Sequence, residues 1–245
     1  IVCIQESPAF RHGEYVNSMI VTFLAAVSAK LCNAKEAPLP DEKKHMSIRH
    51  KLCEYGTGIP SILTILFGAA YGSVNTFIAM MASEVGIENA GLFFIVGTIF
   101  VFISRPFGGR IFDSKGGFWV ILPGGILYLI GLGILVSAQS LTVLLVASVF
   151  YGFGGGLLLP SLMTWMLNVV TPDRRSGASA TFYNMLDIGT SSGIILLGSV
   201  AGSIGYVNMY YYVIGVMVIF IAFFMFNHFV LQKKVKKQNQ QEELA

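Results

Sequence analysis

Six long apolar runs, separated by short polar stretches, dominate the chain from residue 59 onward. They cover residues 59–82, 89–107, 118–138, 141–170, 177–203 and 207–231. A helix needs roughly 20 apolar residues to cross a hydrocarbon core of about 30 Å, and each run is close to or above that length. Because a backbone in lipid must satisfy its own hydrogen bonds, runs of this length are predicted to be helices. The pattern predicts an all-α membrane domain over residues 59–231.

The remaining residues divide into three segments. Residues 1–32 form an uncertain N-terminal segment, in which residues 15–32 are apolar enough for a possible extra transmembrane helix. Residues 33–58 form a polar linker, where Pro38 and Pro40 interrupt any helix. The chain closes with a basic tail over residues 232–245.

Composition supports the membrane class. Hydrophobic residues make up 54% of the 245 residues and charged residues only 12%, with a mean hydropathy of +0.69. A soluble domain carries about 25% charged residues. The basic residues lie in loops beside apolar runs and not on one face of a soluble domain, which argues against nucleic-acid binding. No HExxH, GxSxG or P-loop motif is present, so we expect neither an enzyme nor a bound cofactor or metal.

Lysine and arginine placement predicts the orientation of the helices. All but Arg11 of the 16 basic residues fall in or just before the linker, where Lys30 precedes it, in residues 104–117, in the loop near Pro172 or in the tail. The alternate loops, at 83–88, 138–141 and 203–207, contain none. Cytoplasmic loops of membrane proteins carry the excess of lysine and arginine. The linker, residues 104–117 and the C-terminus are therefore predicted to be cytoplasmic.

Residues 104–117 concentrate charge and glycine between the second and third runs, and we predict a tight hairpin there. The pattern Gly109-x-x-x-Asp113-x-x-Gly116 resembles the loop that joins the second and third helices of each half of major facilitator superfamily transporters. The family's basic residue after the last glycine is absent, because Gly117 stands in its place.

Two further stretches carry the same resemblance. Residues 172–178, Pro-Asp-Arg-Arg-Ser-Gly-Ala, are similar to a Pro-x-Arg-Arg-Gly-x-Ala loop before the eleventh helix of bacterial members, with the glycine displaced by Ser176. The glycine-rich run over residues 152–160 also fits the tenth helix. The resemblance implies the C-terminal six-helix half of a twelve-helix transporter. The missing N-terminal half would then be its partner, and the transport path would lie between the halves.

The resemblance also implies a cytoplasmic gate at the charged loops. In the family this loop holds the cytoplasmic ends of the helices together in one transport state. The alternative is a tight loop whose charges are simply solvated. The gate candidates are Arg105, Gly109, Arg110, Asp113, Gly116, Arg174 and Arg175.

Asp187 is the candidate for proton or cation coupling. It lies about ten residues into its run, or ~15 Å deep, near the middle of the membrane core. A carboxylate at that depth is costly in free energy and is a functional candidate by default. The alternative is an acid that pairs with a base in the other half or holds helices together. Substrate-cavity candidates are Tyr71, Asn75, Tyr183, Asn184 and Ser191, although helix-to-helix hydrogen bonding explains Tyr71 and Asn75 almost as well.

Four glycine pairs, each four residues apart, predict close helix contacts. They are Gly68/Gly72, Gly152/Gly156, Gly189/Gly193 and Gly198/Gly202.

Together these features predict proton-coupled efflux of a small organic solute by alternating access, in a bacterial plasma membrane. The expected partners are the solute, protons, the lipid bilayer and the other transporter half. Two alternatives stay open: uptake of a sugar or organic anion, and a truncated membrane module that binds without transporting.

Overall fold

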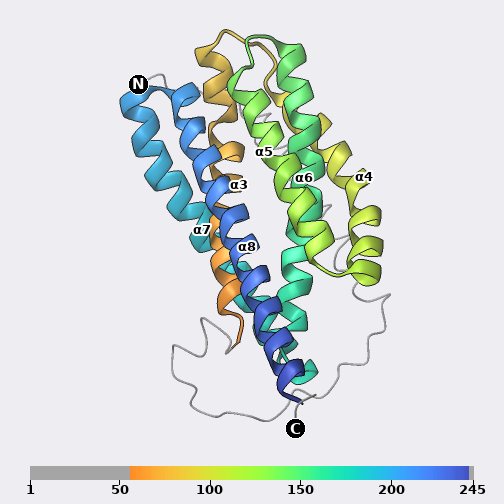
Figure 1. Cartoon of the computed structure of the whole chain (residues 1–245). Helices are drawn as coiled ribbons and strands as arrows, with labels where there is room; N and C mark the ends of the chain where they lie inside the picture. The colour runs from red at the N-terminus through yellow and green to blue at the C-terminus, as the bar shows by residue number, and fades with distance from the viewer. Residues whose placement is uncertain (1–55, 243–245) are drawn as a thin grey trace, which may run out of the picture. The chain divides into compact units, whose positions relative to one another are not determined.

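The structure is a computed structural model that describes the backbone of residues 56–242 and the side chains of residues 56–229. The possible helix at residues 15–32 and nearly all of the linker lie outside the described residues. The described part is a bundle of long helices (Figure 1).

Six helices in this part are long and apolar enough to cross a membrane, as the hydropathy pattern predicts. A short 3-10 turn, η1 (Pro172–Arg174), precedes α7. The helices are α3 (Gly58–Glu84), α4 (Gly91–Lys115), α5 (Phe118–Val136), α6 (Leu141–Asn168), α7 (Arg175–Ile204) and α8 (Tyr206–Glu242).

The predicted hairpin at residues 104–117 is wrong in its extent. Helix α4 continues through Pro106 to Lys115, and only Gly116 and Gly117 join it to α5. A helix that leaves the membrane has no reason to stop at a charge, because its backbone hydrogen bonds are internal on both sides of the boundary. It stops at Gly116, whose φ of +86° is a conformation that favours glycine.

The last helix continues beyond the predicted span into the basic tail. Helix α8 does not end near residue 231 but extends to Glu242. Most of residues 232–245 are therefore a helical continuation of the last span.

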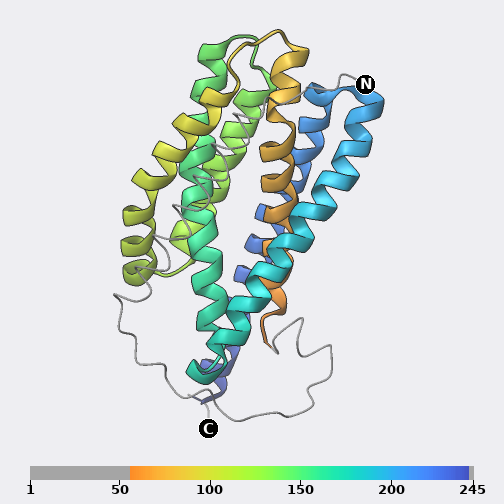
Figure 2. The same ribbon diagram turned by 180° about the vertical axis from the view of Figure 1, so that it is seen from behind.

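Successive helices run antiparallel, so their connections alternate between the two ends of the bundle (Figures 1 and 2). The connections α4–α5 and α6–α7 lie at one end, and we call this the basic end. Its five described cations are Arg105, Arg110, Lys115, Arg174 and Arg175. The opposite end carries the carboxylates Glu84 and Glu88 and, among residues 56–229, no lysine or arginine.

Helix α6 packs against two neighbours through its glycines. A Cβ added at Gly152 would collide with the backbone of Gly97 in α4, and one added at Gly156 would collide with Ser104. Gly154, on another side of the helix, faces the backbone of α5. Because lipid provides no hydrophobic drive for helix association, close van der Waals packing of this kind stabilises the bundle.

Helices α3 and α7 pack in the same way, with glycines on both sides. A Cβ at Gly68 would lie 2.8 Å from the carbonyl oxygen of Leu186, and one at Gly193 would lie 2.5 Å from that of Ala69. The predicted close contacts are confirmed for Gly68/Gly72, Gly152/Gly156 and Gly189/Gly193. The fourth pair is only half right: Gly198 packs on Phe77, whereas Gly202 faces open space.

One carboxylate joins α3 to α8 at the end opposite the basic end. The Tyr206 backbone N–H, at the start of α8, donates to Glu84 Oε2 at 2.6 Å. A negative charge at a helix N-terminus is favourable, because the unpaired N–H groups there carry partial positive charge.

Candidate functional site

A polar contact in the middle of the bundle links α3 to α6. The Asn75 side-chain amide donates to the Tyr71 carbonyl oxygen at 2.8 Å and to the Tyr151 hydroxyl at 3.1 Å. Asn75 and Tyr71 are half-buried, and Tyr151 is buried. These contacts favour the interhelical hydrogen-bonding interpretation of Asn75 over an open cavity lining.

Tyr151 belongs to an aromatic cluster that the sequence did not reveal. Its ring centroid lies 4.9 Å from Tyr128 of α5 and 5.2 Å from Phe93 of α4. Phe67 of α3 packs edge-on against Tyr128 at 5.5 Å. Hydropathy treats these side chains as ordinary apolar positions, so only their spacing in the fold identifies the cluster.

Asp187 of α7 is exposed at the surface of the bundle, whereas Asn75 is half-buried inside it. Asp187, Tyr183 and Ser191 are exposed on one side of α7, and Asn184 is half-buried beside them. Tyr183 keeps 54% of its surface exposed. The opposite side of the helix packs against α3 through its glycines, as described above. These four residues form what we call the α7 polar face: Tyr183, Asn184, Asp187 and Ser191.

The α7 polar face cannot lie against hydrocarbon at low cost. A carboxylate in lipid costs several kcal/mol, so Asp187 must face protein or water. Among the described side chains, none donates a hydrogen bond to its carboxylate; Thr190 Oγ1 donates only to the Asp187 backbone oxygen, at 3.0 Å. The cavity residues expected from the sequence therefore divide into two sets. One is inside the bundle, at Tyr71 and Asn75, and the other is on its surface.

The gate candidates gather at the basic end. Arg105, Gly109, Arg110 and Asp113 are exposed on the last turns of α4. Arg105 lies over the ring of Phe102, one turn earlier, at 5.6 Å from its centroid. Within the described side chains Asp113 makes no ion pair. The α4 charges are therefore held at the surface of this bundle, available to another element.

A small cavity adjoins the gate residues of α4. Its volume is about 200 Å³, and Arg105 and Gly109 line it together with Pro160, Ser161 and Thr164 of α6. An added Cβ at Gly109 would meet no atom of the described chain within 4 Å. The packing inside this bundle therefore does not require glycine there.

Arg174 and Arg175 lie at the second connection of the basic end. Arg174 closes η1 and Arg175 opens α7, and both are exposed. The two basic connections thus present their charges at the same end of the bundle, as the alternation of lysine and arginine along the sequence predicts.

Several bacterial transporters are similar to this chain. The proton-coupled antiporter flippase LtaA of Staphylococcus saprophyticus is 25% identical over 217 residues, which cover 83% of this chain and 52% of the relative. The staphylopine export protein of Staphylococcus aureus is 26% identical over 171 residues, covering 67% and 42%. Multidrug resistance protein 3 of Bacillus subtilis is 28% identical over 111 residues, covering 45% and 22%. The chain spans about half the length of the first relative and less of the other two.

A solved structure shares the fold. The crystal structure of a mutant of the peptide transporter POT, in complex with alafosfalin, superposes with a TM-score of 0.61 at 18% identity. The match covers 69% of this chain and 38% of that one. A family match described as Major Facilitator Superfamily extends over residues 61–244, which include all of α4 to α8 and most of α3. This chain is a member of the major facilitator superfamily.

Proposed function

We propose that this chain is the C-terminal six-helix half of a secondary transporter that exports a small organic solute in exchange for protons. The observation that carries the proposal is the α7 polar face, where Asp187 is exposed near the middle of a membrane helix. An acid in that position is expensive unless it meets water or a second transporter half. A protonatable group at the boundary of the two halves is what proton coupling requires.

The names of the similar transporters favour export over uptake. One is a proton-coupled antiporter, one is an export protein and one is a multidrug resistance protein. In this proposal Asp187 exchanges protons, while Tyr183, Asn184 and Ser191 contact the solute. Tyr71 and Asn75 contribute from the interior by positioning α3 against α6.

We further propose that the basic end faces the cytoplasm of a bacterial plasma membrane. All five described cations lie there, and in the sequence the lysines of the linker and the tail belong to the same alternate set of loops. The α4 and η1 charges then form the cytoplasmic gate against the other half. Alternating access moves the two halves as rigid bodies around a site between them.

Asp187→Asn tests the coupling. Everted membrane vesicles that contain the transporter are energised by respiration, and ethidium serves as the probe solute. We expect pH-gradient-driven ethidium uptake in the wild type and loss to background in Asp187→Asn, because the amide cannot exchange a proton. Glu88→Gln is the matched control, since Glu88 is an exposed carboxylate at the other end of the bundle.

Two outcomes would contradict this proposal. Wild-type, pH-driven ethidium flux in Asp187→Asn would remove Asp187 from the coupling step. Proton-driven accumulation of a sugar in right-side-out vesicles, without ethidium export, would favour the uptake alternative.

A further inference from the structure

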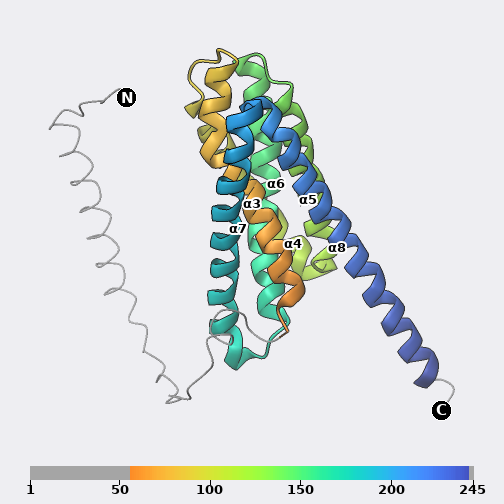
Figure 3. The same ribbon diagram turned by 90° about the vertical axis from the view of Figure 1, so that its left-hand side faces the viewer.

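A second cavity lies at the basic end, away from the α7 polar face and from Asn75. Its volume is about 320 Å³, at the lower end of the range for small-molecule sites, roughly 300–1,000 Å³. It is bounded by the end of α4, the start of α5, the end of α6 and the lower part of α8. In Figure 3, α8 leans away from the rest of the bundle toward its C-terminal end.

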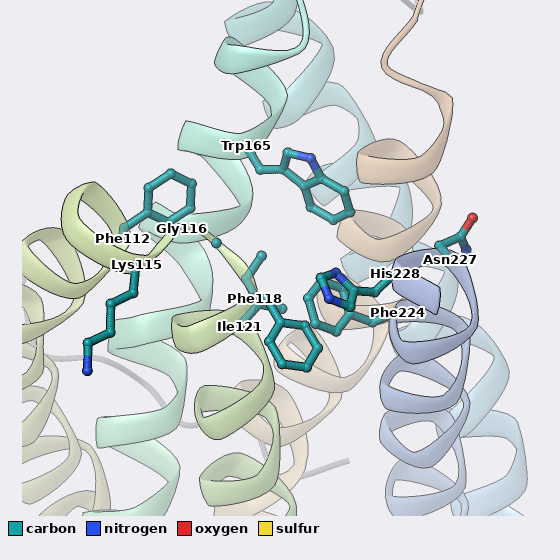
Figure 4. A pocket seen from close by; sticks show the side chains of 10 residues that line it. Phe112, Lys115, Gly116, Phe118, Ile121, Trp165, Phe224, Asn227 and His228 are labelled. Atoms are coloured by element: carbon teal, nitrogen blue, oxygen red, sulfur yellow. The ribbon is translucent and has the colours of Figure 1, made fainter. Parts of the chain in front are cut away.

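The walls of this cavity are aromatic. Phe118 stacks on His228 with ring centroids 4.0 Å apart and an interplanar angle of 22°. Phe118 also stacks on Phe224 at 5.8 Å, and Trp165 meets Phe224 edge-on at 5.8 Å. Figure 4 shows these rings gathered from α5, α6 and α8 around one space. We call this site the aromatic pocket.

The rim of the aromatic pocket is basic. Lys115, the last residue of α4, lines the pocket, and its ammonium group points away from the aromatic rings (Figure 4). Its Nζ lies 5.9 Å from the ring centroid of Trp119. The described lining contains no Asp or Glu. In the sequence, Lys233, Lys234, Lys236 and Lys237 follow in the next turns of α8.

The position of the pocket is that of the membrane–water interface. It lies where α4 and α6 end and α5 begins, so each wall comes from the end of a span. Tryptophan and lysine are typical of this level, with apolar bodies in the membrane and polar tips in water. An apolar pocket with a cationic rim at this depth matches one molecule of the bilayer: a phospholipid with an anionic headgroup.

We propose that the aromatic pocket binds an anionic phospholipid. An acyl chain enters between Phe118, Trp165 and Phe224, while Lys115 binds the phosphate or the anionic headgroup. The chain's own linker fits the basic rim less well than an anionic lipid, because residues 33–58 carry no net negative charge, with five basic and four acidic side chains. The proposal is independent of the transported solute.

Tryptophan fluorescence tests the proposal, because the chain has only two tryptophans. In a Trp119→Phe background, Trp165 reports on the pocket alone, and Phe keeps an aromatic ring beside Lys115. The full chain is reconstituted in nanodiscs that contain acyl-brominated phosphatidylglycerol or acyl-brominated phosphatidylcholine, since bromine quenches tryptophan on contact. We expect the anionic lipid to quench Trp165 at about five-fold lower mole fraction, the effect of one basic residue at an anionic surface.

Three variants locate the headgroup contact. Lys115→Gln should remove most of the preference for the anionic lipid, and Lys115→Arg should keep it. Arg110→Gln is the matched control, because it removes the same charge from the same helix but does not line the pocket. If Lys115→Gln does not fold, the same preference is measured in the Trp119→Phe protein at 0.5 M NaCl, where screening should abolish it.

Equal quenching by the two lipids would overturn the proposal, as would an anionic preference that survives both Lys115→Gln and high salt. Protection of Trp165 from both brominated lipids, lost when residues 33–55 are deleted, would instead show that a segment of the chain fills the pocket.

Discussion

Individual polar residues in this bundle have very different surroundings. Asn75 binds the Tyr151 hydroxyl across the α3–α6 interface, whereas the Tyr210 hydroxyl is buried and, among described residues, has no hydrogen-bond partner. Asp187, by contrast, lies on an exposed face. Membrane depth alone would treat all three as costly polar groups. The fold separates a structural bond, an unsatisfied group and a group that must meet water or a partner.

Two substitutions distinguish the Asn75–Tyr151 hydrogen bond from the unsatisfied Tyr210 hydroxyl. Tyr151→Phe removes the partner of Asn75, so we expect a loss of about 0.5–1.5 kcal/mol of stability. Tyr210→Phe removes a buried hydroxyl that bonds no described residue, so we expect no loss of stability or a small gain. The measurement is the fraction of monodisperse protein that remains after heating in detergent. Equal destabilisation by both variants would mean that the Asn75–Tyr151 bond contributes nothing beyond packing.

Helix pairs are held together by backbone contact at glycines. The α6 glycines meet α4 on one side and α5 on the other, and the glycines of α3 and α7 interlock. The four-residue spacing of these glycines predicted close packing, but not the partner. The pair Gly198/Gly202 shows that spacing alone does not predict a helix contact, because Gly202 faces open space.

Gly152→Ala is expected to be severely destabilising, by about 2 kcal/mol or more, because its methyl group would overlap the Gly97 backbone. Gly133→Ala on α5 is the control, since a Cβ there meets nothing within 4 Å. Thermal stability in detergent measures both. Tolerance of Gly152→Ala at the level of Gly133→Ala would contradict the close α4–α6 approach.

The described bundle leaves most of its candidate functional residues at its surface. The gate candidates of α4 are exposed in the described chain, as is the α7 polar face apart from half-buried Asn184. A Cβ at Gly109 would meet no described neighbour within 4 Å. In our proposal of a half-transporter, both sets would face the other half. The basic end also carries the aromatic pocket, which is open toward lipid in our proposal.

Gly109→Leu separates folding from gating. We expect this chain to keep its thermal stability, since Gly109 is exposed and an added Cβ there meets no described atom within 4 Å. We expect proton-driven ethidium transport by the complete transporter to fall about ten-fold, equivalent to ~1.4 kcal/mol, because the side chain obstructs closure against the other half. Gly202→Leu, in open space on α7, is the control. Unchanged transport in Gly109→Leu would remove Gly109 from the gate.

The spans, their alternation and the family follow from the sequence by itself, because hydropathy, basic residues and loop motifs are local properties of the chain. The α4 boundary does not follow, since charge and glycine at residues 104–117 look like a loop although the helix persists to Lys115. The sequence also does not predict the Asn75–Tyr151 bond, the exposed position of Asp187 or the aromatic pocket. Each depends on which helices meet, and residues far apart in sequence make those contacts only in the folded bundle.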